Sequence, residues 1–146
     1  MTPNSVAIVG AAETTELGRI PHLSQIALHA DAGLNALADA GLTIRDVDGI
    51  ATAGHNAVEV AHYLGVAPSW VDGTSVGGCS FMVHVRHAVA ALEAGLCRTV
   101  LITHGESGRS KLGRYGPSIA PALFDQQFEQ PYGVTAPPNR FTLPVL

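Results

Sequence analysis

The sequence CRTVLIT at residues 97–103 is the stretch that most clearly indicates the fold. Its β-branched and apolar residues are typical of a strand buried inside a sheet. A segment with helical spacing precedes it at residues 81–94, Gly95 ends that segment, and a polar loop follows at residues 104–107. A helix that leads into a buried strand in this way is typical of an α/β protein.

Capping residues predict two more helices closer to the N-terminus. Ser24 is a favoured N-cap residue and Gly41 a favoured stop, so we predict a long helix at residues 24–40. A shorter helix is predicted at residues 58–64, where Gly65 ends it. In the helix near residues 81–94, the predicted apolar stripe consists of Val83, His87, Ala90, Ala91 and Ala94.

Further strands are predicted between these helices. The run VAIV at residues 6–9 has the composition of a buried strand, and a second strand is expected near residues 50–53. Residues 68–71 form either a third strand or an extended link. Strands that alternate with helices predict an α/β fold with a mainly parallel sheet and helices on both of its faces.

The character of the chain changes after residue 110. Six prolines interrupt residues 111–146, whereas residues 1–110 have the pattern of one α/β domain. Long irregular loops in compact domains are often functional or covered by a partner. We therefore predict an N-terminal domain at 1–110 and the start of a loop or cap region at 111–146 that contacts substrate or a partner.

Composition excludes several classes of protein. Apolar residues make up 47% of the 146 residues and charged residues 14%, which argues against disorder and suggests that another segment or subunit covers part of the surface. A net charge of −4 without a basic run argues against nucleic-acid binding. No apolar stretch is long enough to insert into a membrane, and two cysteines without a signal peptide favour the cytoplasm.

The seven histidines do not form a metal-binding pattern. His84 and His87 lie three residues apart on one predicted helix, but no acidic residue or cysteine stands at ligand spacing beside them. His29 and His62 lie on helices without a partner in sequence, so packing or surface positions are expected for them. No dinucleotide-binding fingerprint follows Gly10. We expect no metal site.

Cys79 is the first candidate for chemistry. It lies in the turn Gly77-Gly78-Cys79-Ser80 at the start of a long predicted helix. A helix N-terminus favours the thiolate form of a cysteine, and the glycines allow a ligand to approach the backbone. Cys79 is therefore a candidate nucleophile, with Gly77, Gly78 and Ser80 as candidate substrate-binding residues. The alternative is a small residue at a tight junction between helix and sheet.

His104 and Glu106 are the second candidates, and substrate binding is the role expected of them. They follow the strand at residues 97–103, and ligands of open α/β sheets bind at the carboxyl ends of strands. The alternative is a polar loop in which Glu106 makes a structural hydrogen bond to the backbone. Cys97 lies at the opposite end of the same strand, so we predict that it is not catalytic.

Several segments resemble, in order and spacing, the thiolase superfamily, and in particular sterol-carrier-protein-type thiolases and bacterial lipid-transfer homologues. The resemblance extends over nearly the whole chain. The most similar part is residues 79–107, which contain a small-residue turn, a helix that ends LEAG, the strand TVLI and then GES. The other similar segments are VAIVG at 6–10, ADAGL at 38–42, DVDG at 46–49 and YGVTAP at 132–137.

The resemblance implies a layered thiolase fold, usually dimeric, and an acyl-CoA thioester as substrate, with no covalently bound cofactor. It also implies that a cysteine at the start of a central helix accepts the acyl group. Counted back from Gly95, however, the family's spacing puts that position at Gly78 and not at Cys79. Two hypotheses follow: Cys79 is the nucleophile of an acyltransferase, or the nucleophile is lost.

Loss of the nucleophile would imply either retro-aldol cleavage of a lipid or steroid acyl-CoA, as in some lipid-transfer homologues, or a carrier without catalysis. The family's chains are also much longer, and its histidine and second cysteine motifs lie in a C-terminal half. We therefore expect a fragment or one part of a split protein, which is inactive alone and associates as a homodimer or with a complementary half.

Overall fold

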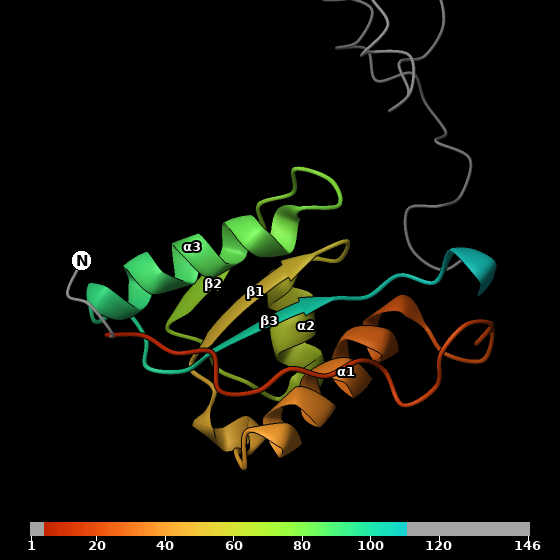
Figure 1. Cartoon of the computed structure of the whole chain (residues 1–146), viewed down its shortest axis with the longest axis horizontal. Helices are drawn as coiled ribbons and strands as arrows, with labels where there is room; N and C mark the ends of the chain where they lie inside the picture. The colour runs from red at the N-terminus through yellow and green to blue at the C-terminus, as the bar shows by residue number, and fades with distance from the viewer. Residues whose placement is uncertain (1–4, 111–146) are drawn as a thin grey trace, which may run out of the picture. The chain divides into compact units, whose positions relative to one another are not determined.

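A three-stranded parallel sheet lies at the centre of the structure, a computed structural model that describes residues 5–110 (Figure 1). The strands are β1 (Gly49–Ala53), β2 (Trp70–Asp72) and β3 (Val100–His104), in the order β2-β1-β3. In the register, Gly49 of β1 is opposite both Trp70 and Val100. The strands expected near residues 50–53, 68–71 and 97–103 are thus confirmed.

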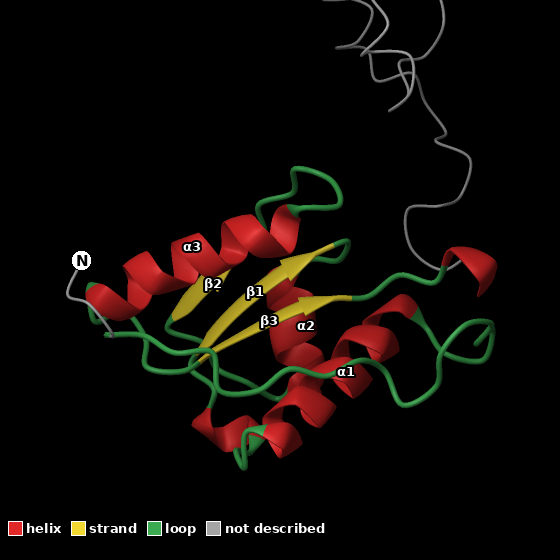
Figure 2. Cartoon of the chain, viewed as in Figure 1, coloured by secondary structure: helices red, strands yellow, loops and turns green. Residues whose placement is uncertain are grey.

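Three helices cover the two faces of this sheet (Figure 2). Helices α1 (Gln25–Asp39) and α2 (Ala57–Leu64) pack together on one face, and α3 (Ser80–Glu93) packs across all three strands on the other. Two short 3-10 turns complete the described elements, at Ile44–Asp46 and Gly108–Ser110. The predicted fold class, a mainly parallel sheet with helices on both faces, is confirmed.

Local caps explain where the helices begin and end. The Ser24 hydroxyl accepts a hydrogen bond from the Ala27 amide at 3.2 Å, and Asn56 caps the start of α2 in the same way. Gly65 ends α2 in the left-handed conformation, with φ of 72°, which glycine adopts without steric cost. These ends lie within a residue of the predicted ones.

The strand predicted at residues 6–9 is wrong. Among the described residues, none pairs with this run as a strand, and Ile8 and Val9 are 79% and 63% exposed. The chain that continues from this run instead lies alongside α1, where the Ala11 amide donates to Asp39 and the Thr15 amide donates to Asp31. Strand composition alone does not form a strand, because the backbone also needs a neighbouring strand to pair with.

The buried face of α3 also differs from the predicted stripe. His87, Ala90 and Ala94 of that stripe are exposed, while Ala91 is buried as expected. The residues of α3 that are fully buried are Ser80, His84, Ala88 and Ala91. Hydropathy misses this face because two of its members are polar: the Ser80 hydroxyl and His84 Nε2 each bond to a nearby backbone carbonyl.

The apolar core lies between the sheet and the helices α1 and α2. Its buried members are Leu37, Val47, Ile50, Ala57, Ala61 and Leu101. None of the helices in residues 5–110 is long and apolar enough to cross a membrane. The cap predicted at residues 111–146 lies outside the described residues, so its predicted role stays a prediction.

Candidate active site at the carboxyl edge of the sheet

The carboxyl ends of the three parallel strands meet at one edge of the sheet. β1 ends at Ala53 and is followed by Gly54-His55, and β3 ends at His104 and is followed by Gly105-Glu106. The turn that contains Cys79 leads from the carboxyl end of β2 into α3. Ligands of open α/β sheets bind at such an edge, so this is where a site is expected.

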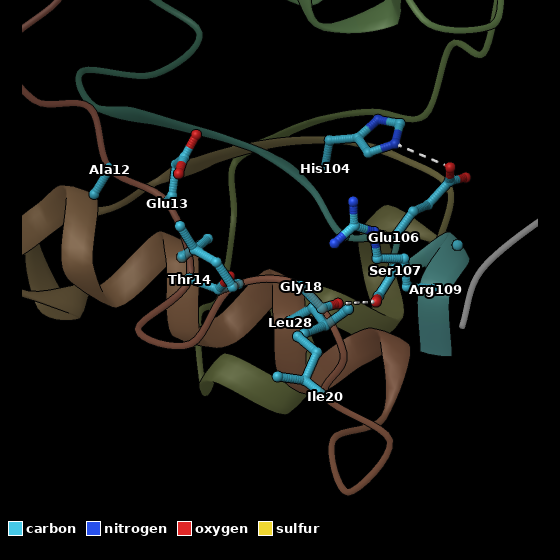
Figure 3. Close-up of a pocket in the computed structure, with 14 residues that line it drawn as sticks. Ala12, Glu13, Thr14, Gly18, Ile20, Leu28, His104, Glu106, Ser107 and Arg109 are labelled. Atoms are coloured by element: carbon cyan, nitrogen blue, oxygen red, sulfur yellow. Dashed lines mark hydrogen bonds and ion pairs between the residues drawn. The ribbon is translucent and has the colours of Figure 1, made fainter. Parts of the chain in front are cut away.

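A pocket of about 400 Å³ opens at this edge, beyond the end of β3 (Figure 3). Two segments far apart in sequence, residues 12–20 and 104–109, form most of its wall, and α1 contributes Leu28 and Ala32. Apolar side chains lie beside polar ones: Leu17, Ile20 and Leu28 on one hand, and Glu13, His104, Glu106 and Arg109 on the other. Such a pocket suits a ligand with one apolar and one polar part.

His104 and Glu106 face one another in this pocket. His104 Nε2 lies 3.5 Å from Glu106 Oε2, and in Figure 3 a dashed line between these two side chains marks the contact. The Glu106 side chain is only 15% exposed, whereas that of His104 is 34% exposed. A mostly buried carboxylate beside an accessible imidazole is an arrangement that orients the ring for proton transfer.

A third polar residue, His29, lies behind the end of β3. Its ring is fully buried, and Nδ1 lies 2.8 Å from the hydroxyl of Thr103. Burial lowers its pKa to about 4, with further contributions from His55 and His104. The His55 ring is 6.0 Å from that of His29 between centroids, and His55 Nε2 lies 2.9 Å from Glu59 Oε2. His29 is therefore neutral near pH 7.

Cys79 is the N-cap residue of α3 and is exposed. Its sulfur lies 3.9 Å from the carbonyl oxygen of Val76, and no side-chain capping bond involves it. Gly77 has φ of 88°, which a residue with a side chain rarely adopts. The turn predicted from the small residues is therefore present, and the thiol is accessible at a helix N-terminus.

Ser80 closes this turn. Its buried hydroxyl donates to the Gly77 carbonyl at 2.6 Å and accepts from the Val76 amide at 2.9 Å. None of the residues 77–80 lines the pocket that contains His104 and Glu106. The structure therefore brings the second pair of predicted site residues together and leaves the first group outside that pocket.

Two histidines of α3 hold the loop before this turn. Asp72 accepts from the amide and hydroxyl of Thr74 through Oδ1, and its Oδ2 lies 2.6 Å from Nδ1 of His87. Burial would raise the pKa of Asp72, but these hydrogen bonds outweigh it and lower the pKa to about 2. His84, which is buried, contacts the Thr74 carbonyl at 2.8 Å. The two histidines thus have separate partners, and in the described part of the chain no group of three or more possible ligands is placed to hold a metal ion.

Cys97 lies at the amino end of β3 and is buried against Gly49. Burial, together with the nearby Asp48 carboxylate, raises the pKa of its thiol. A buried thiol that resists ionisation is a poor nucleophile. Cys97 lies at the far end of the strand from His104, and its lack of a catalytic role stays a prediction.

His29 and His55 lie close behind the site without lining the pocket, and sequence inspection missed both. His55 follows the carboxyl end of β1 just as Glu106 follows that of β3, so the rule that singled out His104 and Glu106 would also have found it. His29 gave no such signal, because it lies in the middle of a helix whose buried face is otherwise apolar. Its packing position was expected, but its contact with Thr103 was not.

No known family profile matches the sequence. It is 29% identical over 148 residues to a 17-hydroxy-3-oxo-4-pregnene-20-carboxyl-CoA lyase of Mycobacterium tuberculosis, covering 94% of this chain and 38% of that protein. It is also 29% identical over 146 residues to a steroid side-chain-cleaving aldolase of Thermomonospora curvata, covering 92% and 37%. The chain therefore spans less than two fifths of the length of these relatives, and both relatives are enzymes that cleave bonds.

Two solved structures have a similar fold. The Ltp2-ChsH2(DUF35) aldolase matches with a TM-score of 0.68 and 25% identity, over 89% of this chain and 34% of that one. A monomeric SCP2-thiolase-like protein from Mycobacterium smegmatis matches with a TM-score of 0.57 and 26% identity, over 68% and 23%. The acyltransferase interpretation finds no support among these proteins, whereas the retro-aldol alternative does. By fold and by sequence, the chain thus resembles thiolase-like proteins of the lipid-transfer type, as its sequence predicted.

Proposed function

We propose that this chain is part of a retro-aldol lyase that cleaves a carbon–carbon bond in a steroid or lipid β-hydroxyacyl-CoA. The observation that supports this most directly is that both curated relatives, each aligned over more than nine tenths of the chain, are a lyase and an aldolase. The resemblance to thiolases also supports an acyl-CoA thioester as the substrate. In the proposed reaction the thioester stabilises an enolate and does not transfer its acyl group.

The reaction needs a base and a stabilised oxyanion but no acyl-enzyme. A base removes the proton from the β-hydroxyl, whose oxygen then forms a carbonyl group as the bond between the α and β carbons breaks. The electron pair of that bond moves onto the α carbon and is delocalised into the thioester as an enolate, which a proton then neutralises. The products are a ketone and a shortened acyl-CoA, and no free CoA is consumed.

The pocket beyond β3 supports this chemistry. His104 is accessible there, and the carboxylate of Glu106 lies beside its Nε2 at 3.5 Å, so Nδ1 is the nitrogen that would accept the hydroxyl proton. The apolar side chains of Leu17, Ile20 and Leu28 offer contacts for the hydrocarbon part of a substrate. In this proposal Glu106 orients His104 and His104 acts on the substrate, whereas the sequence predicted only substrate binding for the two residues.

Cys79 has no required part in the proposed reaction. Its thiol is exposed at the start of α3, outside the pocket lining that contains His104 and Glu106. We propose that the turn at residues 77–80 contacts the thioester end of the acyl-CoA through its backbone. An acyltransferase would instead need Cys79 to carry the acyl group.

We further propose that this chain works together with a second copy or a complementary chain segment. Apolar side chains surround the Cys79 turn on the described surface: Val76, Phe81 and Met82 are 53%, 47% and 63% exposed. Exposed apolar groups that cluster in this way often mark a surface that is covered in an assembly. A monodisperse monomer that cleaves substrate without any other chain would contradict this.

A direct test compares two substrates on the protein as purified from its source, with any segment or subunit that accompanies this chain. A β-hydroxyacyl-CoA with a tertiary hydroxyl should be cleaved without added CoA, and a 3-ketoacyl-CoA with added CoA should not be. His104→Gln should lower kcat by about 100-fold or more, because it removes the proposed base. Cys79→Ser should retain most of the activity.

The opposite pattern would overturn the proposal. Cleavage that depends on free CoA, together with an acyl adduct on Cys79 detected by mass spectrometry, would identify an acyltransferase. Binding of both acyl-CoA substrates without cleavage of either would favour a carrier.

A further inference from the structure

The residues on either side of His104 are both in contact with one buried side chain, that of His29. Its Nδ1 lies 2.8 Å from the Thr103 hydroxyl. On the other side of His104, Gly105 packs so tightly against the same ring that a Cβ atom there would lie 2.5 Å from His29 Cδ2. His29 thus contacts the strand just before His104 and the loop just after it.

Strand geometry makes this arrangement consequential for His104. Along β3 and its exit the side chains alternate, so Thr103 and Gly105 are buried toward α1 while His104 is turned to the other side and exposed. The direction of the His104 side chain is set by the backbone at residues 103–105. A side chain that fixes residues 103 and 105 therefore also fixes the direction in which residue 104 points.

We propose that His29 is a positioning residue that holds His104 in its orientation toward Glu106. The inference rests on the proposed function, in which His104 is the base, but it concerns a residue of α1 that does not line the pocket. His29 would act through the hydrogen bond to Thr103 and through packing against Gly105, and not by contact with the substrate.

The surroundings of His29 fit a neutral ring in this role. The ring is fully buried, His55 lies at 6.0 Å, and Nε2 has no hydrogen-bond partner among the described residues. A positive charge there would be close to His55 and His104, so the neutral form is favoured. A neutral imidazole retains one N–H group and one acceptor nitrogen, and either can bond the Thr103 hydroxyl.

Two variants of His29 separate hydrogen bonding from packing. His29→Leu fills much of the same space without a polar atom, and His29→Asn keeps a polar atom near the position of Nδ1. His62→Leu, on the exposed side of α2, is the matched control. Thr103→Val removes the hydroxyl from the other side with little change in shape.

The first readout does not depend on activity. The imidazole signals of His104 are followed by NMR at one fixed pH, and nuclear Overhauser effects between the ring and the Glu106 side chain report how the two side chains lie. In His29→Leu and Thr103→Val, these effects should weaken and the ring signals should shift, because His104 then no longer points toward Glu106. His29→Asn should restore most of both signals, and His62→Leu should leave them unchanged.

The second readout is cleavage of the β-hydroxyacyl-CoA. His29→Leu should lower kcat about tenfold with little change in KM, because a displaced base affects the chemical step more than binding. Unchanged ring signals and Overhauser effects of His104 in a folded His29→Leu protein would overturn the inference, and if that variant does not fold, Thr103→Val decides in the same way. If these signals change in His29→Leu but the wild type cleaves neither substrate, His29 remains a positioning residue and the proposed function alone is rejected.

Discussion

His29 and Gly105 are in direct contact, and the contact leaves no room for a side chain at residue 105. A Cβ atom there would lie 2.5 Å from His29 Cδ2 and 3.0 Å from the backbone oxygen of Gln25. We expect Gly105→Ala to lower the free energy of unfolding by about 1 to 3 kcal/mol, the usual range for overpacking. Urea denaturation measures this. Gly73→Ala is the control, since a Cβ at Gly73 would meet no atom within 4 Å, and equal effects of the two substitutions would contradict the prediction.

Protonation of His29 should make the protein less stable in mild acid. The pKa of His29 is about 4 in the folded protein and near 6.5 in the unfolded chain, because burial and the nearby His55 and His104 disfavour the charged ring. Between these two pH values the unfolded chain binds more protons than the folded protein does. The contribution of neutral His29 to the free energy of unfolding is therefore complete above about pH 6.5 and is lost as the pH falls toward 4. The loss amounts to about 3 kcal/mol.

The measurement is urea denaturation near pH 7 and near pH 4 for the wild type and for His29→Leu. Other groups titrate in the same range, so the informative quantity is the difference between the two proteins. The decrease in stability should be smaller in His29→Leu by about 3 kcal/mol, while His62→Leu should behave like the wild type. A decrease of the same size in all three proteins would show that His29 does not titrate in this range.

The two cysteines should differ in reactivity. Cys79 is exposed, whereas Cys97 is buried and its thiol pKa is raised by burial and by Asp48. Iodoacetamide added to the native protein near neutral pH should therefore modify Cys79 at least about tenfold faster than Cys97, since the thiolate is the reactive form. Peptide mass spectrometry after short exposures gives both rates. Comparable rates for the two cysteines in the native protein would argue against the buried position of Cys97. Comparable rates after denaturation are expected and serve as the control.

Ser80 should matter for stability whatever its part in substrate binding. Its hydroxyl bonds both the Val76 amide and the Gly77 carbonyl, and it is fully buried. Ser80→Ala leaves these groups without that partner, so we expect a loss of about 1 to 3 kcal/mol in the free energy of unfolding. Ser75→Ala, in the same loop but exposed, should change stability by less than about 0.5 kcal/mol. Equal free energies of unfolding for the Ser80→Ala and Ser75→Ala proteins would contradict a structural role for Ser80.

Much of the candidate site could be predicted from position along the strands. His104 and Glu106 follow a clear strand, and the structure brings them together in one pocket. The turn at residues 77–80 was also expected from its small residues. The distance between the turn and the pocket could not be predicted, because it depends on how α3 lies across the sheet.

The sequence by itself determined the helices, the strands near residues 50–53 and 97–103, and their parallel arrangement, while it left residues 68–71 as either a strand or an extended link. These features follow from local causes, such as the Ser24 and Gly65 caps and the apolar periodicity of each segment. Their agreement with the structure reflects interactions within a few residues, which a sequence displays directly.

The tertiary structure alone decided which segments pair and which polar groups meet. Residues 6–9 have strand composition, yet they lie along α1 and do not pair as a strand within the described residues. His84 is buried on α3 where the Thr74 carbonyl accepts a hydrogen bond from its Nε2, and His29 is buried on α1 where its Nδ1 lies 2.8 Å from the Thr103 hydroxyl. Each partner is distant in sequence or set by packing, and burying a polar side chain costs less free energy where such a partner is found.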